Sequence, residues 1–127
     1  MFENLDIFKI SSAMARHAGT RQALISQNVA NADTPGYLAR DLPTFESSYE
    51  MSGGMSFRAT RSGHLSGSEL IENGASFVER NEASPDGNTV SIEQQMLKAT
   101  ETIRQHDRAL AIYKSALGVL RSSLGRR

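Results

Sequence analysis

The chain has 127 residues, of which 39% are hydrophobic and 6% aromatic, so it can form at most one domain and its core will be thin. Fourteen basic and fourteen acidic residues cancel, which argues against nucleic acid or an anionic membrane surface as the main partner. The absence of cysteine excludes disulfides and thiolate metal sites. There is no secretory signal pattern and no apolar run long enough to span a membrane, which taken alone predicts a cytoplasmic protein without membrane insertion.

A first helix is predicted from about Asn4 to Ala32, because its apolar residues recur at the helical period and form one stripe. Arg21 interrupts this stripe where a core residue would be expected. The helix-packing residues predicted from the stripe are Ile7, Ile10, Met14, Ala18, Ile25, Val29 and Ala32.

The first helix is predicted to stop at a polar string that runs from Ser26 to Tyr37. Pro35 disfavours a helical conformation at the residue before it, and Pro followed by Gly36 suits the centre of a type II turn. Two asparagines, Asn28 and Asn31, lie three residues apart and can hydrogen-bond a neighbouring helix or the backbone of the turn. Taken one by one, such residues are also compatible with the end of any ordinary helix.

The middle of the chain, residues 38–90, has little periodicity and few large apolar side chains. A short helix is predicted from Leu42 to Tyr49, with Asp41 as its cap. Alternating residues predict weak strands at 55–59 and 76–80, which could pair as an irregular hairpin. We expect this segment to be extended and to depend on neighbouring subunits for order.

A second helix is predicted from Ser91 to Leu124, because Ser91 and Gln94 fit a capping box. Its apolar positions alternate in steps of four and three, which is the repeat of a left-handed coiled coil. The predicted seam consists of Ile92, Met96, Ala99, Ile103, His106, Leu110, Tyr113, Leu117, Leu120 and Leu124.

Together these patterns predict a mainly α fold, in which two long terminal helices pair as an antiparallel coiled-coil hairpin around an irregular, weakly β middle segment. We divide the chain into an N-terminal helix and turn (1–37), the middle segment (38–90) and the C-terminal coiled-coil helix (91–127), which form one structural unit. The hairpin alone should be only marginally stable, because chain entropy offsets most of the apolar burial.

No residue pattern points to catalysis. The three histidines, His17, His64 and His106, are too scattered to form a recognisable metal or catalytic site. His106 lies in the predicted seam, where a polar residue more often sets the register of a coiled coil than binds a ligand. We therefore predict neither an enzyme nor a cofactor.

Two strings in the sequence resemble signatures of the bacterial flagellar rod, hook and hook-associated proteins. The first helix of that family ends in a pattern that this chain carries at Asn28, Ala30, Asn31, Thr34, Pro35, Gly36 and Tyr37. The stretch before the second helix is similar to the one that introduces the C-terminal helix in proximal rod proteins, and it is carried by Asp86, Gly87, Asn88, Val90 and Glu93. Ser91, Gln94 and Gln95 stand where acidic residues are usual.

This resemblance implies a structural subunit of the flagellar basal-body rod, most like the proximal rod proteins, which assembles helically and transmits torque for motility. Its partners would be copies of itself, other rod and basal-body proteins and the flagellar type III export apparatus. It would reach the periplasm-spanning rod without a cleaved signal peptide. The periodicity alone is equally compatible with a cytoplasmic coiled-coil adaptor or a chaperone-like protein.

Overall fold

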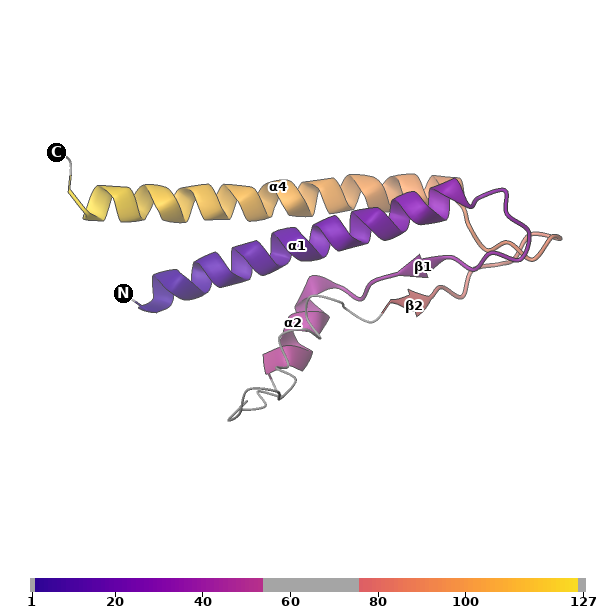
Figure 1. The fold of residues 1–127 in the computed structure, drawn as a ribbon, viewed down its shortest axis with the longest axis horizontal. Coiled ribbons are helices and arrows are strands. Elements are labelled where there is room, and N and C mark those ends of the chain that lie inside the picture. Colours follow the sequence, from indigo (N-terminus) through magenta and orange to yellow (C-terminus); the bar gives the residue numbers. More distant parts are fainter. Residues whose placement is uncertain (1, 54–75, 126–127) are drawn as a thin grey trace, which may run out of the picture.

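The protein was analysed as a computed structural model that describes residues 2–53 and 76–125. Two long helices dominate the fold, α1 (Phe2–Ala30) and α4 (Ile92–Ser123), and they lie side by side (Figure 1). A two-stranded ribbon and the short helix α2 lie on the opposite side of α1 from α4. The predicted fold class, two paired terminal helices around a weakly β middle, is confirmed.

Contacts at the two ends of the helix pair show that α1 and α4 run antiparallel. Near the start of α1, the ring of Phe8 meets the ring of Tyr113 edge to face, with their centroids 5.1 Å apart. Near the end of α1, Asn28 Nδ2 donates to Gln95 Oε1 across 3.1 Å. Partners of residues further along α1 thus come from earlier positions in α4, which places both chain ends at the same end of the helix pair (Figure 1).

The buried face of α4 lies one residue away from the predicted seam. Its buried side chains are Gln95, Thr102 and Ala109, which follow one another at seven-residue intervals. They meet a face of α1 that is also lined by small side chains, including the buried Ser11 and Ala18. Small residues let the two helices approach closely, so most of the larger apolar side chains of α4 are directed elsewhere.

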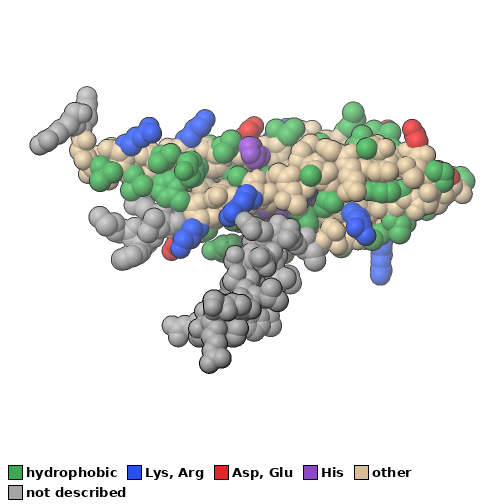
Figure 2. All heavy atoms as spheres, viewed as in Figure 1, with side chains coloured by type: hydrophobic (Ala, Val, Ile, Leu, Met, Phe, Trp, Pro, Cys, Tyr) green, Lys and Arg blue, Asp and Glu red, His purple; other side chains and the backbone are tan. Residues whose placement is uncertain are grey.

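The predicted packing of the α4 seam against α1 is therefore only partly present in the isolated chain, where Tyr113 meets Phe8 of α1 but several larger side chains stay exposed. Met96 is 65% exposed, Ile103 is 53% exposed and Leu124 is 83% exposed. Figure 2 shows apolar side chains on the surface of the helix pair, over both long helices. Of the seam residues, Ala99, His106, Leu117 and Leu120 are half-buried, and the exposed ones are Ile92, Met96, Ile103, Leu110, Tyr113 and Leu124.

In α1 the predicted stripe is only partly buried. Ala18 and Ile25 are buried in the helix pair, and Met14 is half-buried. The remaining three large side chains of the stripe stay exposed. These three residues are Ile7, Ile10 and Val29.

The ribbon pairs β1 (Arg40–Asp41) with β2 (Phe77–Val78) in an antiparallel register. The second of the two predicted strands, 76–80, is thus present at its centre, but its partner is Arg40–Asp41. The other predicted strand, 55–59, lies outside the described residues.

The short helix α2 spans Phe45–Gly53 and begins three residues after the predicted start. Asp41 does not cap α2 as predicted, because its carboxylate accepts from the Leu42 backbone N–H at 2.8 Å and from Arg21. Thr44 instead occupies the capping position, since its carbonyl accepts from Ser48 N.

None of the helices in the part of the chain that the structure describes combines the length and the apolar character needed to cross a membrane.

Candidate functional site at the junction of the two signatures

The turn predicted after the first helix is present, and it redirects the chain away from the helix axis. The Tyr37 backbone N–H donates to the Thr34 carbonyl across 3.2 Å, which closes the turn. Gly36 has φ +72°, a left-handed conformation that a side chain would disfavour. Pro35 is exposed and contributes through its fixed φ rather than through contacts.

The two signature strings, about fifty residues apart in the sequence, lie against each other in the fold. Gly36 N donates to the Asp86 carbonyl, and Thr89 N donates to the Tyr37 carbonyl, each across 3.0 Å. Ala39 N then donates to Thr89 Oγ1 at 2.8 Å. These bonds connect the exit from α1 directly to the entrance of α4.

Both signatures place a glycine in the left-handed region where they meet. Gly87 also has a positive φ, +81°. A Cβ atom added at Gly87 would lie 3.5 Å from the Gly36 Cα, which is an ordinary van der Waals contact, so the two glycines are neighbours. The positive φ, rather than a lack of space, is what disfavours a side chain at either position.

Asn88 joins the second signature to the end of the first helix. Its Nδ2 group donates to the carbonyls of Asn31, Ala32 and Thr34 at 3.0, 2.8 and 2.8 Å. Its Oδ1 atom accepts from Val90 N at 2.7 Å. Since the last carbonyls of a helix have no partner within the helix, the buried Asn88 acts as the C-terminal cap of α1 from a distant part of the chain.

Asn28 has the corresponding role on the other side of the junction, where it binds the chain that enters β1. Its Nδ2 donates to the Arg40 carbonyl at 2.7 Å, while its Oδ1 accepts from the Arg40 N–H at 3.1 Å. The same amide reaches α4 through Gln95, and Tyr37 Oη donates to its Oδ1 across 3.4 Å. Asn28 therefore joins α1, β1 and α4 through a single buried side chain.

The other signature residues contribute less to the junction. Asn31 donates to the Gln27 carbonyl and accepts from Thr34 Oγ1, both at the surface. Ala30 and Glu93 are exposed. The side-chain amides of the junction bind backbone groups. The site therefore holds the backbone in its path and offers no group for catalysis.

A network of four charged side chains lies beside the junction and connects four segments of the fold. Arg21 of α1 forms a two-pronged ion pair with Asp41 of β1, with nitrogen–oxygen distances of 2.8 and 2.9 Å. Lys98 of α4 lies 3.3 Å from Asp41 Oδ2 and also binds Glu79, directly after β2. The Arg21 that interrupts the apolar stripe is thus the residue that attaches the ribbon to α1.

The positive charges of this network keep the Asp41 carboxyl ionised. Burial by itself would raise the pKa of the Asp41 carboxyl, but the Arg21 hydrogen bonds and the positive charges of Arg21 and Lys98 lower the pKa below its ordinary value. The hydrogen bonds to Asp41 raise the pKa of Arg21 in turn. Both groups are therefore charged at neutral pH although the pair is largely buried.

His17 attaches the start of α2 to α1. Its Nε2 atom lies 2.9 Å from the Pro43 carbonyl, which can only accept, so Nε2 carries the proton of the neutral ring. The ring also meets the edge of Phe45, with centroids 5.7 Å apart. Nδ1 is buried and has no hydrogen-bond partner among the described residues. Burial, and then the charge of Arg21, lower the pKa of His17 despite the opposing Pro43 bond and the charge of Asp41.

We expect acid to destabilise the fold through His17. Because the folded-state pKa lies below the ordinary 6.5, the unfolded chain binds more protons as the pH falls through that value. The contribution of His17 to stability is thus complete above about pH 6.5 and decreases below it. Urea unfolding at pH 7.5 and pH 5 should show a smaller loss of stability in His17→Gln, which cannot titrate, than in the wild type. An equal loss in both proteins would contradict this assignment.

Arg21, Asp41, Glu79, Lys98 and Gln95 were not among the predicted site residues. The sequence indicates Arg21 only as an interruption of the apolar stripe of the first helix. Its partner Asp41 and the Lys98 partner Glu79 lie in the middle segment, where no periodic pattern points to them. Within residues 2–53 and 76–125 there is no cluster of three or more His, Asp or Glu side chains that could hold a metal ion.

Comparison with known proteins shows which family this chain belongs to. The sequence profile described as "Flagella basal body rod protein" matches residues 11–37, which contain the end of α1 and the turn. The chain is 31% identical to the flagellar basal body rod protein FlgB of Agrobacterium fabrum, over 87% of each chain. It is 30% identical to FlgB of Salmonella typhimurium, over 76% of this chain and 77% of that protein. Identity of 30% or more over more than two thirds of each chain shows the family, and the chain therefore belongs to the FlgB family of flagellar basal body rod proteins.

Proposed function

We propose that this chain is a structural subunit of the flagellar basal-body rod, which assembles with other basal-body proteins and has no catalytic role. Family membership supports the location. The observation that carries the assembly role is the exposed seam of α4. Met96, Ile103 and Leu110 of α4, and Leu124 directly after it, recur at multiples of seven residues and remain exposed. A heptad of apolar side chains outside the intramolecular interface suits a second helical partner.

The finer role is a proximal rod subunit that joins copies of itself and other rod proteins in a helical array and transmits torque. A contact between unlike surfaces that repeats without closing produces such an array. The long helix pair suits this role, because the interlocked signatures and the charge network attach the ribbon and α2 firmly to it. Passage through the flagellar type III export apparatus belongs to the same proposal.

The seam can be tested with Leu110→Glu in a strain that lacks the chromosomal copy. Because Leu110 is 40% exposed, the isolated variant should lose only about 1 to 2 kcal/mol of stability and remain helical by circular dichroism. A charge in an intersubunit seam should nevertheless abolish motility and remove the protein from purified basal bodies. The matched control is Ser115→Glu, which is exposed on α4 outside the seam. Normal incorporation of Leu110→Glu would contradict the proposed assembly surface.

A further inference from the structure

The backbone groups of the two-stranded ribbon point toward two different edges. β1 lies next to α1, and β2 lies on the side of β1 that faces away from α1 (Figure 1). Glu79 N donates to the Ala39 carbonyl across 2.9 Å, and the next pair in the register is Arg40 with Val78. Because bonded and non-bonded pairs alternate in an antiparallel ribbon, the backbone groups of Arg40 and Val78 point away from each other.

The inner edge of the ribbon is occupied, whereas the outer edge is free. Asn28 of α1 binds both the N–H and the carbonyl of Arg40, as a neighbouring strand would. On the outer edge the corresponding groups belong to Ser76, Val78 and Arg80 of β2 and its flanks. None of these backbone groups bonds any other residue that the structure describes. An unpaired strand edge is a template for one more strand.

The exposed face of the ribbon combines apolar side chains with positive charge. Ala39 and Asp41 are buried, and the side chains that alternate with them face outward. The outward-facing residues of the two strands and their flanks are Leu38, Arg40, Val78 and Arg80. Neither arginine forms an ion pair within the part of the chain that the structure describes. Figure 2 shows basic side chains standing out from the side of the molecule on which the ribbon lies.

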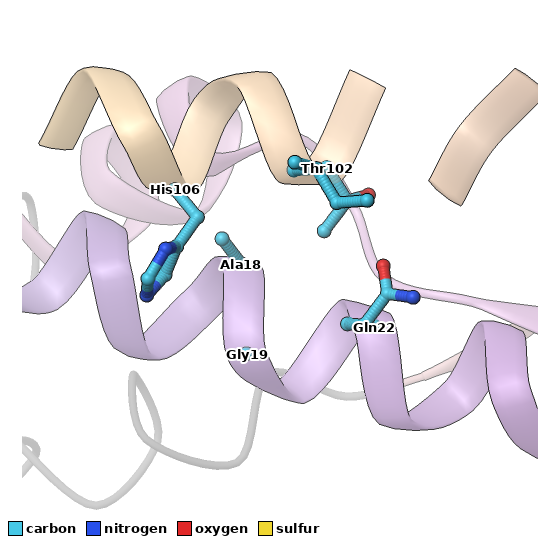
Figure 3. A pocket seen from close by; sticks show the side chains of 6 residues that line it. Ala18, Gly19, Gln22, Thr102 and His106 are labelled. Atoms are coloured by element: carbon cyan, nitrogen blue, oxygen red, sulfur yellow. The ribbon is translucent and has the colours of Figure 1, made fainter. Parts of the chain in front are cut away.

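The space between the two long helices suits a different kind of group. A cavity of about 290 Å³ there is lined by Ala18, Gly19, Gln22, Thr102, Ile103 and His106 (Figure 3). No carboxylate, ammonium or guanidinium group is among these lining side chains. The combination of a free strand edge with unpaired positive charge therefore directs an acidic partner to the ribbon.

We infer that the outer edge of β2 is the docking site for an extended, acidic segment of a neighbouring rod subunit, which adds a third strand to the ribbon. The main chain of that segment bonds the N–H and carbonyl groups of Val78 and its flanks. One of its apolar side chains packs on Val78, and a carboxylate binds the Arg80 guanidinium. The inference rests on the proposed function and adds the place and the chemistry of one subunit contact.

The same edge of a second copy is a poor occupant. Two β2 strands paired edge to edge would bring Arg40 and Arg80 of both copies into one small sheet, and like charges on neighbouring strands repel each other. Charged side chains on an edge strand are a common means by which proteins prevent unselective strand pairing. The two arginines thus exclude self-pairing and favour a partner of opposite charge.

The critical variant is Val78→Pro, which removes one N–H group from the outer edge. Because Val78 N does not bond β1, the ribbon keeps its own hydrogen bonds, and the isolated variant should unfold at the same urea concentration as the wild type. Its amount in purified basal bodies should fall about tenfold, since one main-chain hydrogen bond contributes roughly that factor to an interface. The matched control is Val78→Thr, which keeps the N–H group and the branched side chain and should incorporate at the wild-type level.

The charge of the partner is tested separately with Arg80→Glu. Arg80 is exposed, so the isolated variant should keep the stability of the wild type. Its amount in basal bodies should fall about tenfold or more, because the partner's carboxylate then meets a like charge. Arg80→Lys keeps the positive charge and should retain most of the incorporation. Incorporation of Arg80→Glu at the wild-type level would contradict an acidic occupant.

Photo-cross-linking identifies the occupant. A benzophenone amino acid in place of Phe77, which is exposed on β2, changes one aromatic side chain for another and leaves Val78 and Arg80 unchanged. In assembled basal bodies it should form an adduct with an extended segment of a rod subunit that contains aspartate or glutamate. An adduct with a helix, or with β2 of a second copy, would overturn the inference.

The outcome for the wild type separates this inference from the proposed function. If wild-type protein is absent from basal bodies, the rod function itself is wrong. If the wild type is present, and Val78→Pro and Arg80→Glu are present at the same level, only the inference about the ribbon edge fails.

Discussion

Replacing Asp41 by alanine is expected to unfold most of the protein at room temperature. The change removes the acceptor shared by Arg21 and Lys98 and leaves the Arg21 guanidinium, whose side chain is 12% exposed, without its partner. Breaking a buried pair from one side costs about 3 to 5 kcal/mol, because the remaining charge stays desolvated. A domain with so thin a core has little more stability than this to lose. Urea denaturation followed by circular dichroism measures the effect.

A surface ion pair provides the control. Asp6 and Lys9 are 3.6 Å apart in α1, but their side chains are 67% and 79% exposed. Asp6→Ala should therefore lower stability by no more than about 0.5 kcal/mol. Similar losses for Asp6→Ala and Asp41→Ala would show that the network contributes no more than an ordinary surface pair. At low pH the wild type should approach Asp41→Ala, since the lowered pKa of Asp41 makes its contribution present above the ordinary value of 3.8 and lost as the pH falls through the folded value.

Replacing Asn88 by aspartate should have a comparably large effect with almost no change of shape. The Nδ2 group that donates to three carbonyls becomes an oxygen, so attraction to Asn31, Ala32 and Thr34 turns into repulsion. Losing the bonds of a buried donor costs about 1 to 3 kcal/mol, and burying a charge beside unpaired carbonyls adds to that cost. We expect a loss of about 3 kcal/mol or more in urea unfolding, together with fraying at the end of α1.

Asn31 is the control position, because it is also an asparagine of a signature but does not cap α1 from a distant part of the chain. Its amide bonds the Gln27 carbonyl at the surface, where water can replace it. Asn31→Ala should consequently cost about 1 kcal/mol or less. Hydrogen exchange at the Thr34 to Tyr37 turn would report the difference, because Asn88→Asp should expose this turn and Asn31→Ala should leave it protected. Equal exchange in the two variants would argue against Asn88 as the cap of α1.

The sequence predicts the local features of this fold well. The turn at Pro35 and Gly36 depends only on the conformational limits of those two residues, and the start of α4 depends on the short capping motif of Ser91, whose side chain accepts from Gln94 N. Such features are set by neighbouring residues and need no knowledge of tertiary structure. The two signatures are visible for the same reason, although their mutual contact is not.

The face of α4 that meets α1 could not be predicted from its periodicity. Two stripes one residue apart both have a seven-residue repeat, and only one of them is apolar. Hydrophobicity therefore selected the stripe of Met96 and Ile103. The fold selects the stripe of Gln95 and Thr102 instead, because Gln95 finds a buried hydrogen bond at Asn28 and small side chains allow close packing. That choice depends on a partner 67 residues away in the sequence.

The hydrogen bonds from Gly36 N to the Asp86 carbonyl and from Thr89 N to the Tyr37 carbonyl hold together the two ends of the chain between Tyr37 and Asp86. This part of the chain is therefore a closed loop. For a flexible loop, doubling the length costs only about 0.6 kcal/mol of additional closure entropy. Insertions or deletions between α2 and β2, outside the residues that hold the junction and the charge network, should therefore disturb the helix pair very little. The fold can therefore accept inserted segments of very different length at this place, while the packing of α1 against α4 stays the same.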